Sequence, residues 1–348
     1  MGFKKIIKIL HIADTHNRHF GRLYYSYGRK LSIGFIKNNV NLLQLSDRDL
    51  LSGKILNRKS FLINSIKKNI LNFNPDIILF SHVDNLDYPS FANLKEKFKN
   101  IIFCQYFVDS LDEKFIYFQK HKSRFLLKSQ FCDFNFITTE PSVLNFVDLN
   151  KTFFIPNVVD SSIEILKNFN NKNLSHDVFF ALSHGQHRAI LKKNYLDERE
   201  FYAQLIKSKI KKNLFFGADK TEPIWGDDFF TQLSKCKMGI NLSRGGPIKY
   251  YSSDRISSIM GNGLMCFLQK NYSFEDFFTK NKDAVYFGSV EELIDKIKYY
   301  SIHDKIRIKI AKSGYNKYHS LFNATTVTKY MLQKILGLKI YHKKLWMK

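Results

Sequence analysis

The sequence has 348 residues, more than a single hydrophobic core usually serves, so we expect two domains. Hydrophobic residues make up 44% and aromatic residues 15%, a composition that excludes a disordered chain. Of the net charge of +24, most comes from the two ends, since residues 1–100 hold 17 Lys and Arg against 7 Asp and Glu, and residues 301–348 hold 11 against one.

Short apolar runs alternate with helical patterns through the first half of the chain. This alternation predicts βαβ units and a parallel sheet. One intervening helix is indicated by Leu62, Ile63, Ile66 and Ile70, which share a face at helical spacing. The expected strands are Ile6–Ala13, Asn41–Leu45, Ile77–Phe80, Ile101–Phe107, Phe134–Thr138 and Thr152–Ile155.

A Pro-Asn turn signal in Ile155–Asp160 interrupts the alternation, and the polar run Lys167–Ser175 follows. We therefore expect an N-terminal domain over residues 1–158 and a C-terminal domain over residues 159–325. Residues 326–348 are expected to form a helix and a basic tail that pack toward the N-terminal domain.

The alternation resumes in the second half. Its expected strands are Asp177–Leu182, Asn213–Gly217, Met238–Leu242, Leu264–Leu268 and Ala284–Phe287. Ser289 is the expected N-cap of the next helix, and the chain reads as helix from His303 to about Leu336. The predicted fold class is α/β with two doubly wound, Rossmann-like domains. Such domains bind ligands at the carboxyl ends of their strands.

The segment Asn241–Ile256 joins a strand end to a helix through a Gly-Gly-Pro turn. We predict that the helix begins near Ser252 or Ser253, where free N–H groups form an anion site suited to a diphosphate. The alternative is an ordinary turn and helix cap with surface cations. The ligand-binding residues predicted here are Arg244, Gly245, Lys249, Tyr251, Ser252, Ser253, Asp254 and Arg255.

The loop after the first strand of the second domain is another candidate, because α/β folds place ligand loops there. Its backbone amides and cations suit phosphate oxygens. We expect no metal, since no third ligand lies near His184 and His187, and an ordinary polar loop is the alternative. The ligand-binding residues predicted here are Ser183, His184, Gly185, Arg188, Lys192 and Lys193.

The N-terminal candidates follow the strands of the first domain. Asp14 and His16 lie on the loop that leaves the first strand, and either could act as a general base on a hydroxyl group. Asp109, His82 and Asp84 project from the same sheet edge. We predict Asp14, His16 and Asp109 as catalytic residues, with a capping or turn role as the alternative for each.

Cysteine usage and hydropathy indicate a soluble cytoplasmic protein. The four cysteines, Cys104, Cys132, Cys236 and Cys266, are far apart and resemble small apolar residues in a reducing compartment. Lysines interrupt the apolar start of the chain, so we expect no signal peptide, and no stretch approaches the ~20 apolar residues of a membrane span.

Residues 176–330 resemble the group-1 glycosyltransferases, especially the spore-coat-maturation-type glycosyltransferase-like proteins. The order and spacing of several pieces carry this resemblance. These pieces are Ile155–Asp160, Ser253–Ile256 with Gly261–Gly263, Ala284–Leu293, Ile310–Gly314 and Tyr318–Leu321.

The resemblance implies a GT-B fold that binds an acceptor in the N-terminal domain and a nucleotide sugar in the C-terminal domain. It also implies that Arg188 with Lys192 or Lys193 contacts the donor diphosphate. Such enzymes need no metal, because helix N-termini and cations neutralise the leaving group. We therefore expect a metal-independent glycosyltransferase with no cofactor besides its nucleotide-sugar co-substrate.

One departure from the family concerns two glutamates, with seven residues between them, that many group-1 enzymes carry. Tyr250 and Ser258 stand at these positions here, and Asp254 is the nearby carboxylate. The sugar, the nucleotide and the stereochemistry therefore stay open. A GT-B-like sugar-nucleotide epimerase, a catalytically inactive homologue and a nucleic-acid-binding protein are the alternatives.

The expected role is surface glycan or glycolipid synthesis, with a glycan or lipid-linked acceptor and without nucleic acid. The basic tail Ile340–Lys348 combines Lys with Tyr and Trp, a mixture that suits a membrane interface. We expect this tail and the basic N-terminal third to contact the inner face of an anionic membrane.

Overall fold

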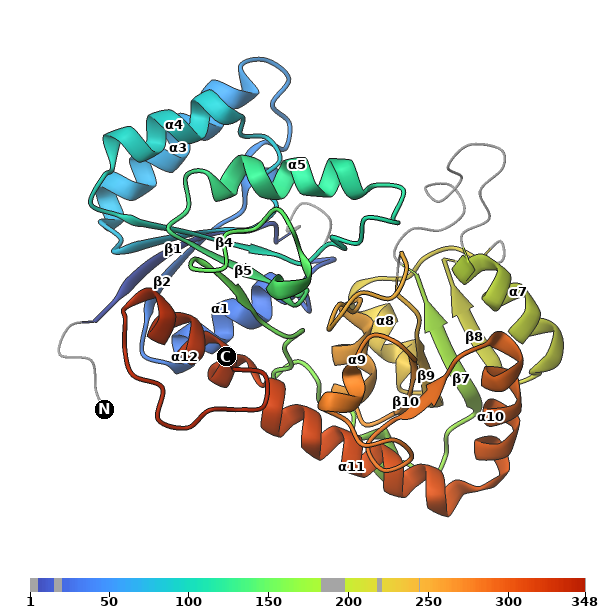
Figure 1. Ribbon diagram of the computed structural model, residues 1–348. Coiled ribbons are helices and arrows are strands. Elements are labelled where there is room, and N and C mark those ends of the chain that lie inside the picture. Colours follow the sequence, from blue (N-terminus) through green and yellow to red (C-terminus); the bar gives the residue numbers. More distant parts are fainter. Residues whose placement is uncertain (1–5, 16–20, 183–197, 218–220, 244, 348) are drawn as a thin grey trace. The chain divides into compact units, whose positions relative to one another are not determined.

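The computed structural model describes the chain except for residues 1–5, 16–20, 183–197, 218–220, 244 and 348. It contains two compact units (Figure 1). The N-terminal unit comprises Met1–Val158 together with Asn323–Lys348, and the C-terminal unit comprises Val159–Phe322. Each unit is a parallel β-sheet with helices on both faces, which confirms the predicted α/β class with two Rossmann-like folds.

The sheet of the N-terminal unit has the strand order β2-β1-β3-β4-β5-β6. Its strands are β1 (Lys8–Ile12), β2 (Asn41–Leu45), β3 (Ile77–Phe80), β4 (Ile102–Phe107), β5 (Phe134–Ile137) and β6 (Thr152–Phe154). In register, Ile9 lies opposite Leu42 of β2 and Ile77 of β3. The chain therefore reverses its direction across the sheet between β1 and β3.

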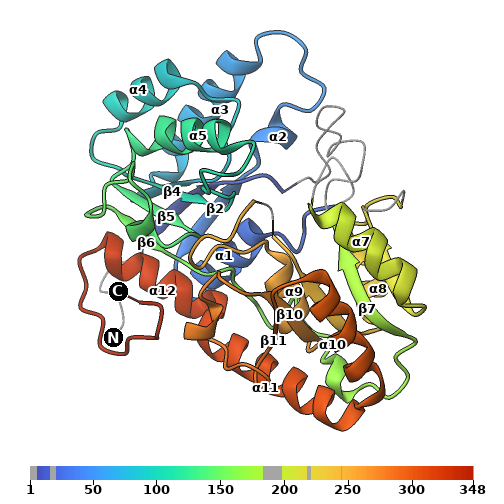
Figure 2. The same ribbon diagram turned by 45° about the vertical axis from the view of Figure 1, so that its right-hand side comes forward.

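Two sets of helices cover this sheet, with α3, α4 and α5 on one face and α1 and α12 on the other (Figures 1 and 2). The predicted apolar face of α3 is confirmed, because Leu62, Ile66 and Ile70 are buried in the core. The helices of the unit are α1 (Tyr27–Lys37), α2 (Asp47–Leu50), α3 (Arg58–Phe73), α4 (Tyr88–Lys97), α5 (Phe118–Ser129) and α12 (Ala324–Ile335).

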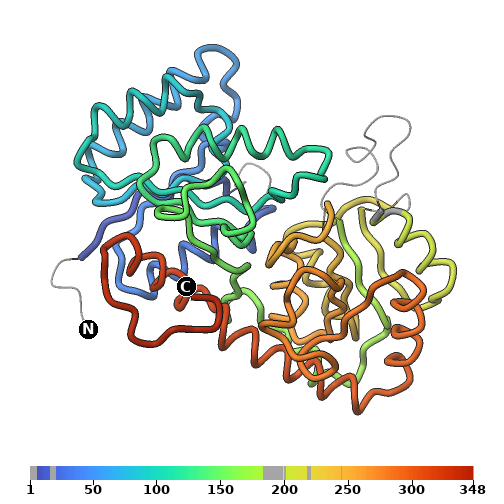
Figure 3. The backbone as a smooth tube through the Cα atoms, in the orientation of Figure 1, coloured from blue at the N-terminus to red at the C-terminus, as the bar shows by residue number. Residues whose placement is uncertain are grey.

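The last helix, α12, packs closely against α1 (Figure 3). A Cβ atom on Gly34 would lie 2.4 Å from the carbonyl oxygen of Ala324, so only glycine permits this approach. The Asn38 amide donates to the carbonyl of Thr325 (2.8 Å) and to the hydroxyl of Thr328 (2.9 Å). The predicted return of the C-terminal helix to the N-terminal domain is thus confirmed.

The sheet of the C-terminal unit has the strand order β11-β10-β9-β7-β8. Its strands are β7 (His176–Ala181), β8 (Asn213–Phe216), β9 (Cys236–Asn241), β10 (Met265–Gln269) and β11 (Val285–Phe287). Its helices are α7 (Glu198–Lys209), α8 (Gly226–Leu233), α9 (Arg255–Gly261), α10 (Val290–Ile302) and α11 (Asp304–Phe322). The predicted N-cap of α10 is confirmed, since the Ser289 hydroxyl accepts from the amide of Glu292 (3.2 Å).

The predicted continuous helix after His303 is wrong. The chain forms α11 and α12 with a break at Asn323, whose side chain accepts from the amide of Thr326 (2.8 Å) and starts the second helix. Asparagine is among the residues preferred at the N-cap, and this preference explains the break at Asn323.

The tryptophan of the basic tail is buried in the N-terminal unit. Trp346 is 1% exposed, and its ring packs 5.1 Å from that of Tyr330 in α12. Its apolar surface therefore belongs to the core of the N-terminal unit. Among the described residues, no helix combines the length and the apolar character required to cross a membrane.

Candidate functional site

Both sheets have a topological switch point, where consecutive crossovers leave in opposite directions. It lies between β1 and β3 in the N-terminal unit and between β7 and β9 in the C-terminal unit. Open α/β sheets bind ligands outside the carboxyl ends of the strands at such points. Each unit therefore has one candidate site at this edge of its sheet.

Arg255 joins the two strand ends at the switch point of the C-terminal unit. Its Nη1 donates to the carbonyl oxygen of Ala181 at the end of β7 (3.1 Å), and its Nη2 donates to that of Leu242 just beyond β9 (2.6 Å). The guanidinium also lies 5.5 Å from the ring centre of Phe180. These contacts fix the points from which the loops after β7 and β9 leave the sheet.

The predicted start of the following helix near Ser252 or Ser253 is wrong, because α9 begins at Arg255. The Ser252 hydroxyl accepts from the Asn241 side chain (2.8 Å), and the Ser253 amide donates to the Ser243 hydroxyl (2.9 Å). These bonds hold the two serines in the loop. The Ser253 amide is therefore already satisfied within the protein.

The other predicted ligand-binding residues are only partly described. Lys249 extends over the ring of Tyr250, with Nζ 5.1 Å from its centre. The Asp254 carboxylate accepts from the hydroxyl of Ser257 (2.8 Å), Gly245 has a φ of +78°, and Tyr251 is buried. Outside the described residues lie Ser183, His184, Gly185, Arg188, Lys192, Lys193, Arg244 and the N-terminal His16.

The two positions at which group-1 enzymes carry glutamates are buried here. Ser258 is 2% exposed within α9. Tyr250 adopts a φ of +63°, and its hydroxyl donates to the carboxylate of Asp276 (2.6 Å). Asp276 was not among the residues predicted from the sequence, because it lies 26 residues further along the chain and only the fold brings it to Tyr250.

A chain of alternating charges lines the carboxyl edge of the sheet in the N-terminal unit. Arg48 lies 3.2 Å from Asp14 and 3.7 Å from Asp84. Arg124 of α5 lies 2.8 Å from Asp84 and 3.0 Å from Asp109. The two arginines thus link the predicted residues Asp14 and Asp109 through Asp84, and the loops after β1, β3 and β4 are joined at one edge.

Two histidines border Asp109. His82 Nε2 lies 3.8 Å and His121 Nε2 lies 3.9 Å from its carboxylate. Burial lowers the pKa of His82 to about 4, so its imidazole is neutral at pH 7. Its Nδ1 then accepts from Arg124 (3.0 Å) and adds a third contact to this guanidinium.

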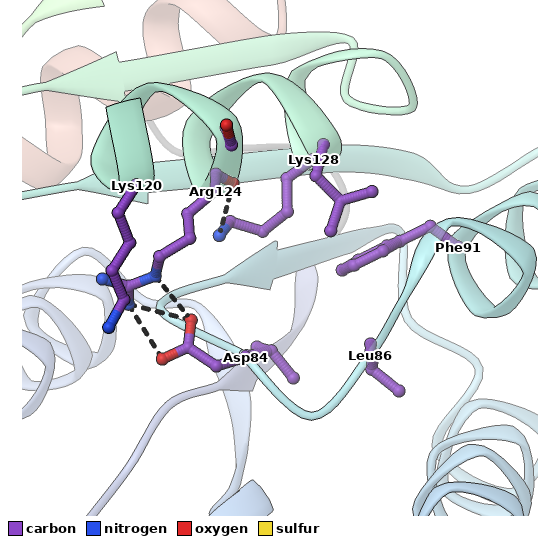
Figure 4. A pocket seen from close by; sticks show the side chains of 9 residues that line it. Asp84, Leu86, Phe91, Lys120, Arg124 and Lys128 are labelled. Atoms are coloured by element: carbon purple, nitrogen blue, oxygen red, sulfur yellow. Dashed lines mark hydrogen bonds and ion pairs between the residues drawn. The ribbon is translucent and has the colours of Figure 1, made fainter. Parts of the chain in front are cut away.

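A cavity of about 400 Å³ opens beside this chain of charges (Figure 4). It lies between the loop after β3 and one face of α5. Its lining residues are Val83, Asp84, Leu86, Phe91, Lys120, Ser123, Arg124, Leu127 and Lys128.

Lys128 is the buried cation of this cavity. It is 2% exposed, and its ammonium donates to the carbonyl oxygen of Arg124 (3.2 Å). Burial lowers the pKa of Lys128 to about 8. Sequence reasoning missed it, although Lys120, Arg124 and Lys128 recur at every fourth position after a strand, a spacing that places them on one helix face.

Residues 195–333 match the model of a family described as glycosyl transferase-like. This part of the chain is therefore similar to that family. This match confirms the predicted resemblance to group-1 glycosyltransferases, and it supports the glycosyltransferase prediction over the epimerase alternative. No curated protein matches the sequence.

The chain has the GT-B fold, which several solved structures share along their full length. Sucrose-phosphate synthase from Thermosynechococcus elongatus is 12% identical, with 95% of this chain and 98% of that chain covered and a TM-score of 0.64. Anabaena HepE in complex with UDP and glucose is 12% identical, with 95% and 100% covered and a TM-score of 0.60. A UDP-N-acetylglucosamine 2-epimerase described as putative, from Listeria monocytogenes, is 14% identical, with 96% of both chains covered and a TM-score of 0.55.

Replacing Lys128 by Met is expected to stabilise the protein. The folded-state pKa of about 8 lies below the ordinary value of 10.5, so the unfolded chain binds more protons between these values. The destabilisation is complete below pH 8 and disappears as the pH rises toward 10.5. We expect the free energy of unfolding of Lys128→Met to increase by about 3 kcal/mol at pH 7.

Denaturant titrations at pH 7 and pH 10 measure this effect. Lys122→Met is the matched control, because Lys122 lies on the same helix but over the rings of Phe118 and Phe146. Its substitution should change the free energy of unfolding by no more than about 0.5 kcal/mol. A loss of stability in Lys128→Met at pH 7 contradicts the prediction.

Proposed function

We propose that this protein transfers a glycosyl group from a nucleoside-diphosphate sugar to an acceptor hydroxyl. The supporting observation is the position of Arg255, which joins the ends of β7 and β9 at the switch point of the C-terminal unit. UDP is the first nucleotide to consider, because HepE was crystallised with UDP and glucose.

In the proposed reaction, the acceptor oxygen bonds to the anomeric carbon while the bond from that carbon to the diphosphate oxygen breaks. The nucleoside diphosphate leaves with the electron pair, and its negative charge requires cations. Lys249, Arg188 and Lys192 or Lys193 are proposed to supply them. Arg255 acts as a positioning residue, because its guanidinium already binds two backbone carbonyls.

On the acceptor side, Asp14 or Asp109 is proposed to orient the hydroxyl group. If the reaction inverts the anomeric centre, the same carboxylate takes the hydroxyl proton; if the reaction retains it, a phosphate oxygen of the donor takes the proton. Each carboxylate is fixed by an arginine, Asp14 by Arg48 and Asp109 by Arg124. Fixed carboxylates suit the placement of a hydroxyl group for attack.

The proposed setting is the cytoplasmic face of a membrane, where surface glycans or glycolipids are assembled. All four cysteines are free and buried, which agrees with a reducing compartment. The loop between α2 and α3 exposes Ile55 by 88% and Leu56 by 79%, and Lys54, Arg58 and Lys59 flank them. Exposed aliphatic side chains with flanking cations suit insertion into an anionic membrane surface.

UDP is expected to raise the midpoint of thermal unfolding by several degrees at about 100 times its dissociation constant. Such saturation adds about 2.7 kcal/mol to the stability of the bound unit. GDP, dTDP, ADP and CMP are screened in parallel. The absence of any shift contradicts the proposed donor site. Steady consumption of the matching nucleotide sugar without an acceptor, beyond hydrolysis, favours an epimerase.

Arg255→Ala is expected to weaken binding of the nucleotide that shifts the midpoint by about tenfold or more, because the loops after β7 and β9 lose a shared anchor. Arg307→Ala is the matched control. Arg307 belongs to the same unit and is buried, whereas Arg255 is half-buried, and Arg307 pairs with Asp304 (2.8 Å) near the amino end of β9. Both variants should lose stability, and calorimetric titration should show weaker nucleotide binding in Arg255→Ala alone. Equal affinities of the two variants would disprove the positioning role.

The double variant Ile55→Ser, Leu56→Ser is expected to lower the partition coefficient onto anionic vesicles by about tenfold, because burial of two aliphatic side chains is lost. Co-sedimentation with phosphatidylglycerol vesicles measures this change. Ile302→Ser is the control, since Ile302 is 80% exposed at the end of α10 and the acidic Asp304 lies two residues further along. Unchanged sedimentation of the double variant would rule out insertion of this loop.

A further inference from the structure

The cavity beside α5 contains positive charge that the protein itself does not neutralise. Arg124 is engaged by Asp84 and Asp109. Lys120 and Lys128 line the same cavity, and neither forms an ion pair with any carboxylate in the part of the chain that the structure describes. The cavity therefore presents two ammonium groups whose counter-charge must come from solvent or from a ligand.

Lys128 supports a bound anion more strongly than Lys120 does, because Lys128 is buried. Its ammonium has three donor protons, and its one hydrogen-bonded partner among the described residues is the carbonyl oxygen of Arg124. The side chain is 2% exposed and lies against the cavity (Figure 4). A buried cation with unused donors is costly unless an anion approaches it.

The remainder of the lining defines the shape of the ligand. Ser123 stands on the same helix face as the cations and adds a hydroxyl donor at the rim. Leu86, Phe91 and Leu127 form an apolar wall. Donors on one side and an apolar wall on the other suit a compact anion attached to a less polar group.

We propose that this cavity binds a phosphate ester, with Lys128, Lys120 and Ser123 on its oxygens and the apolar wall against its organic part. The phosphate ester is assigned to the acceptor, an assignment that rests on the proposed function. Phosphate suits the site better than carboxylate, because it carries more charge and offers three oxygens to the three donors. The aspartates at the strand ends then lie beside the bound acceptor.

The probe is phenyl phosphate, with benzoate and benzyl alcohol as matched carboxylate and neutral compounds. Titrations monitored by NMR or calorimetry should show binding of phenyl phosphate, weaker binding of benzoate and no binding of benzyl alcohol at equal concentration. Lys128→Met should weaken the binding of phenyl phosphate by about tenfold or more, because a charge-assisted hydrogen bond is lost.

Lys122→Met is the control for the loss of one charge on α5. Lys122 does not line the cavity, so its substitution should change the affinity less than about twofold. Equal weakening by both variants indicates general electrostatics and overturns the proposal. Absence of phenyl phosphate binding to the wild-type protein, or benzoate binding of equal strength, overturns it as well.

Two further arms identify the source of the phosphate. Glucose 1-phosphate represents a soluble ester, and phosphatidic acid in vesicles represents a lipid-borne one. The ligand whose binding is weakened by Lys128→Met identifies the acceptor class. Nucleotide binding to the wild-type protein is measured separately, because it reports on the C-terminal unit. If only the nucleotides fail to bind, the proposed transferase activity is contradicted. If only phenyl phosphate fails to bind, the proposed phosphate site in the cavity is contradicted.

Discussion

The C-terminal unit depends on the two hydrogen bonds of the Arg255 guanidinium at the carboxyl edge of its sheet. Parallel strands end with carbonyl groups that the next strand does not satisfy, and those of Ala181 and Leu242 stand at the switch point. One side chain from the start of α9 satisfies both. The strand ends, the first residue of α9 and the loop of Ser252 and Ser253 are therefore fixed as one assembly.

The sequence was sufficient to predict the strands, because buried parallel strands are continuous apolar runs with polar residues at their ends. The run Ile77–Phe80 coincides with the fully buried strand β3. The run Asn41–Leu45 coincides with β2, although this edge strand is only partly buried. Helix starts were harder to predict. Ser252 and Ser253 have the chemistry of N-caps, but their hydrogen bonds to Asn241 and Ser243 hold them in a loop, and these partners lie ten or more residues away.

The candidate site was predictable where it depends on strand ends and not where it depends on helix faces. Asp14 and Asp109 follow strands, so their common edge follows from parallel topology. Arg48 and Arg124 come from helices, and their pairing with these aspartates depends on the crossover geometry. Lys128 was hidden because it follows two leucines, and a lysine in such a position usually extends to solvent.

Two neighbouring cations of the N-terminal unit, Arg124 and Lys128, lie in opposite electrostatic surroundings. Arg124 is partly exposed and has carboxylates on both sides, so its charge costs little free energy and its contacts order the edge of the sheet. Lys128, one helical turn further along, is buried and has no such partner among the described residues. A core position of this kind would be more stable with an aliphatic side chain. The charge at Lys128 is therefore better explained by a ligand that enters the cavity than by the requirements of the fold.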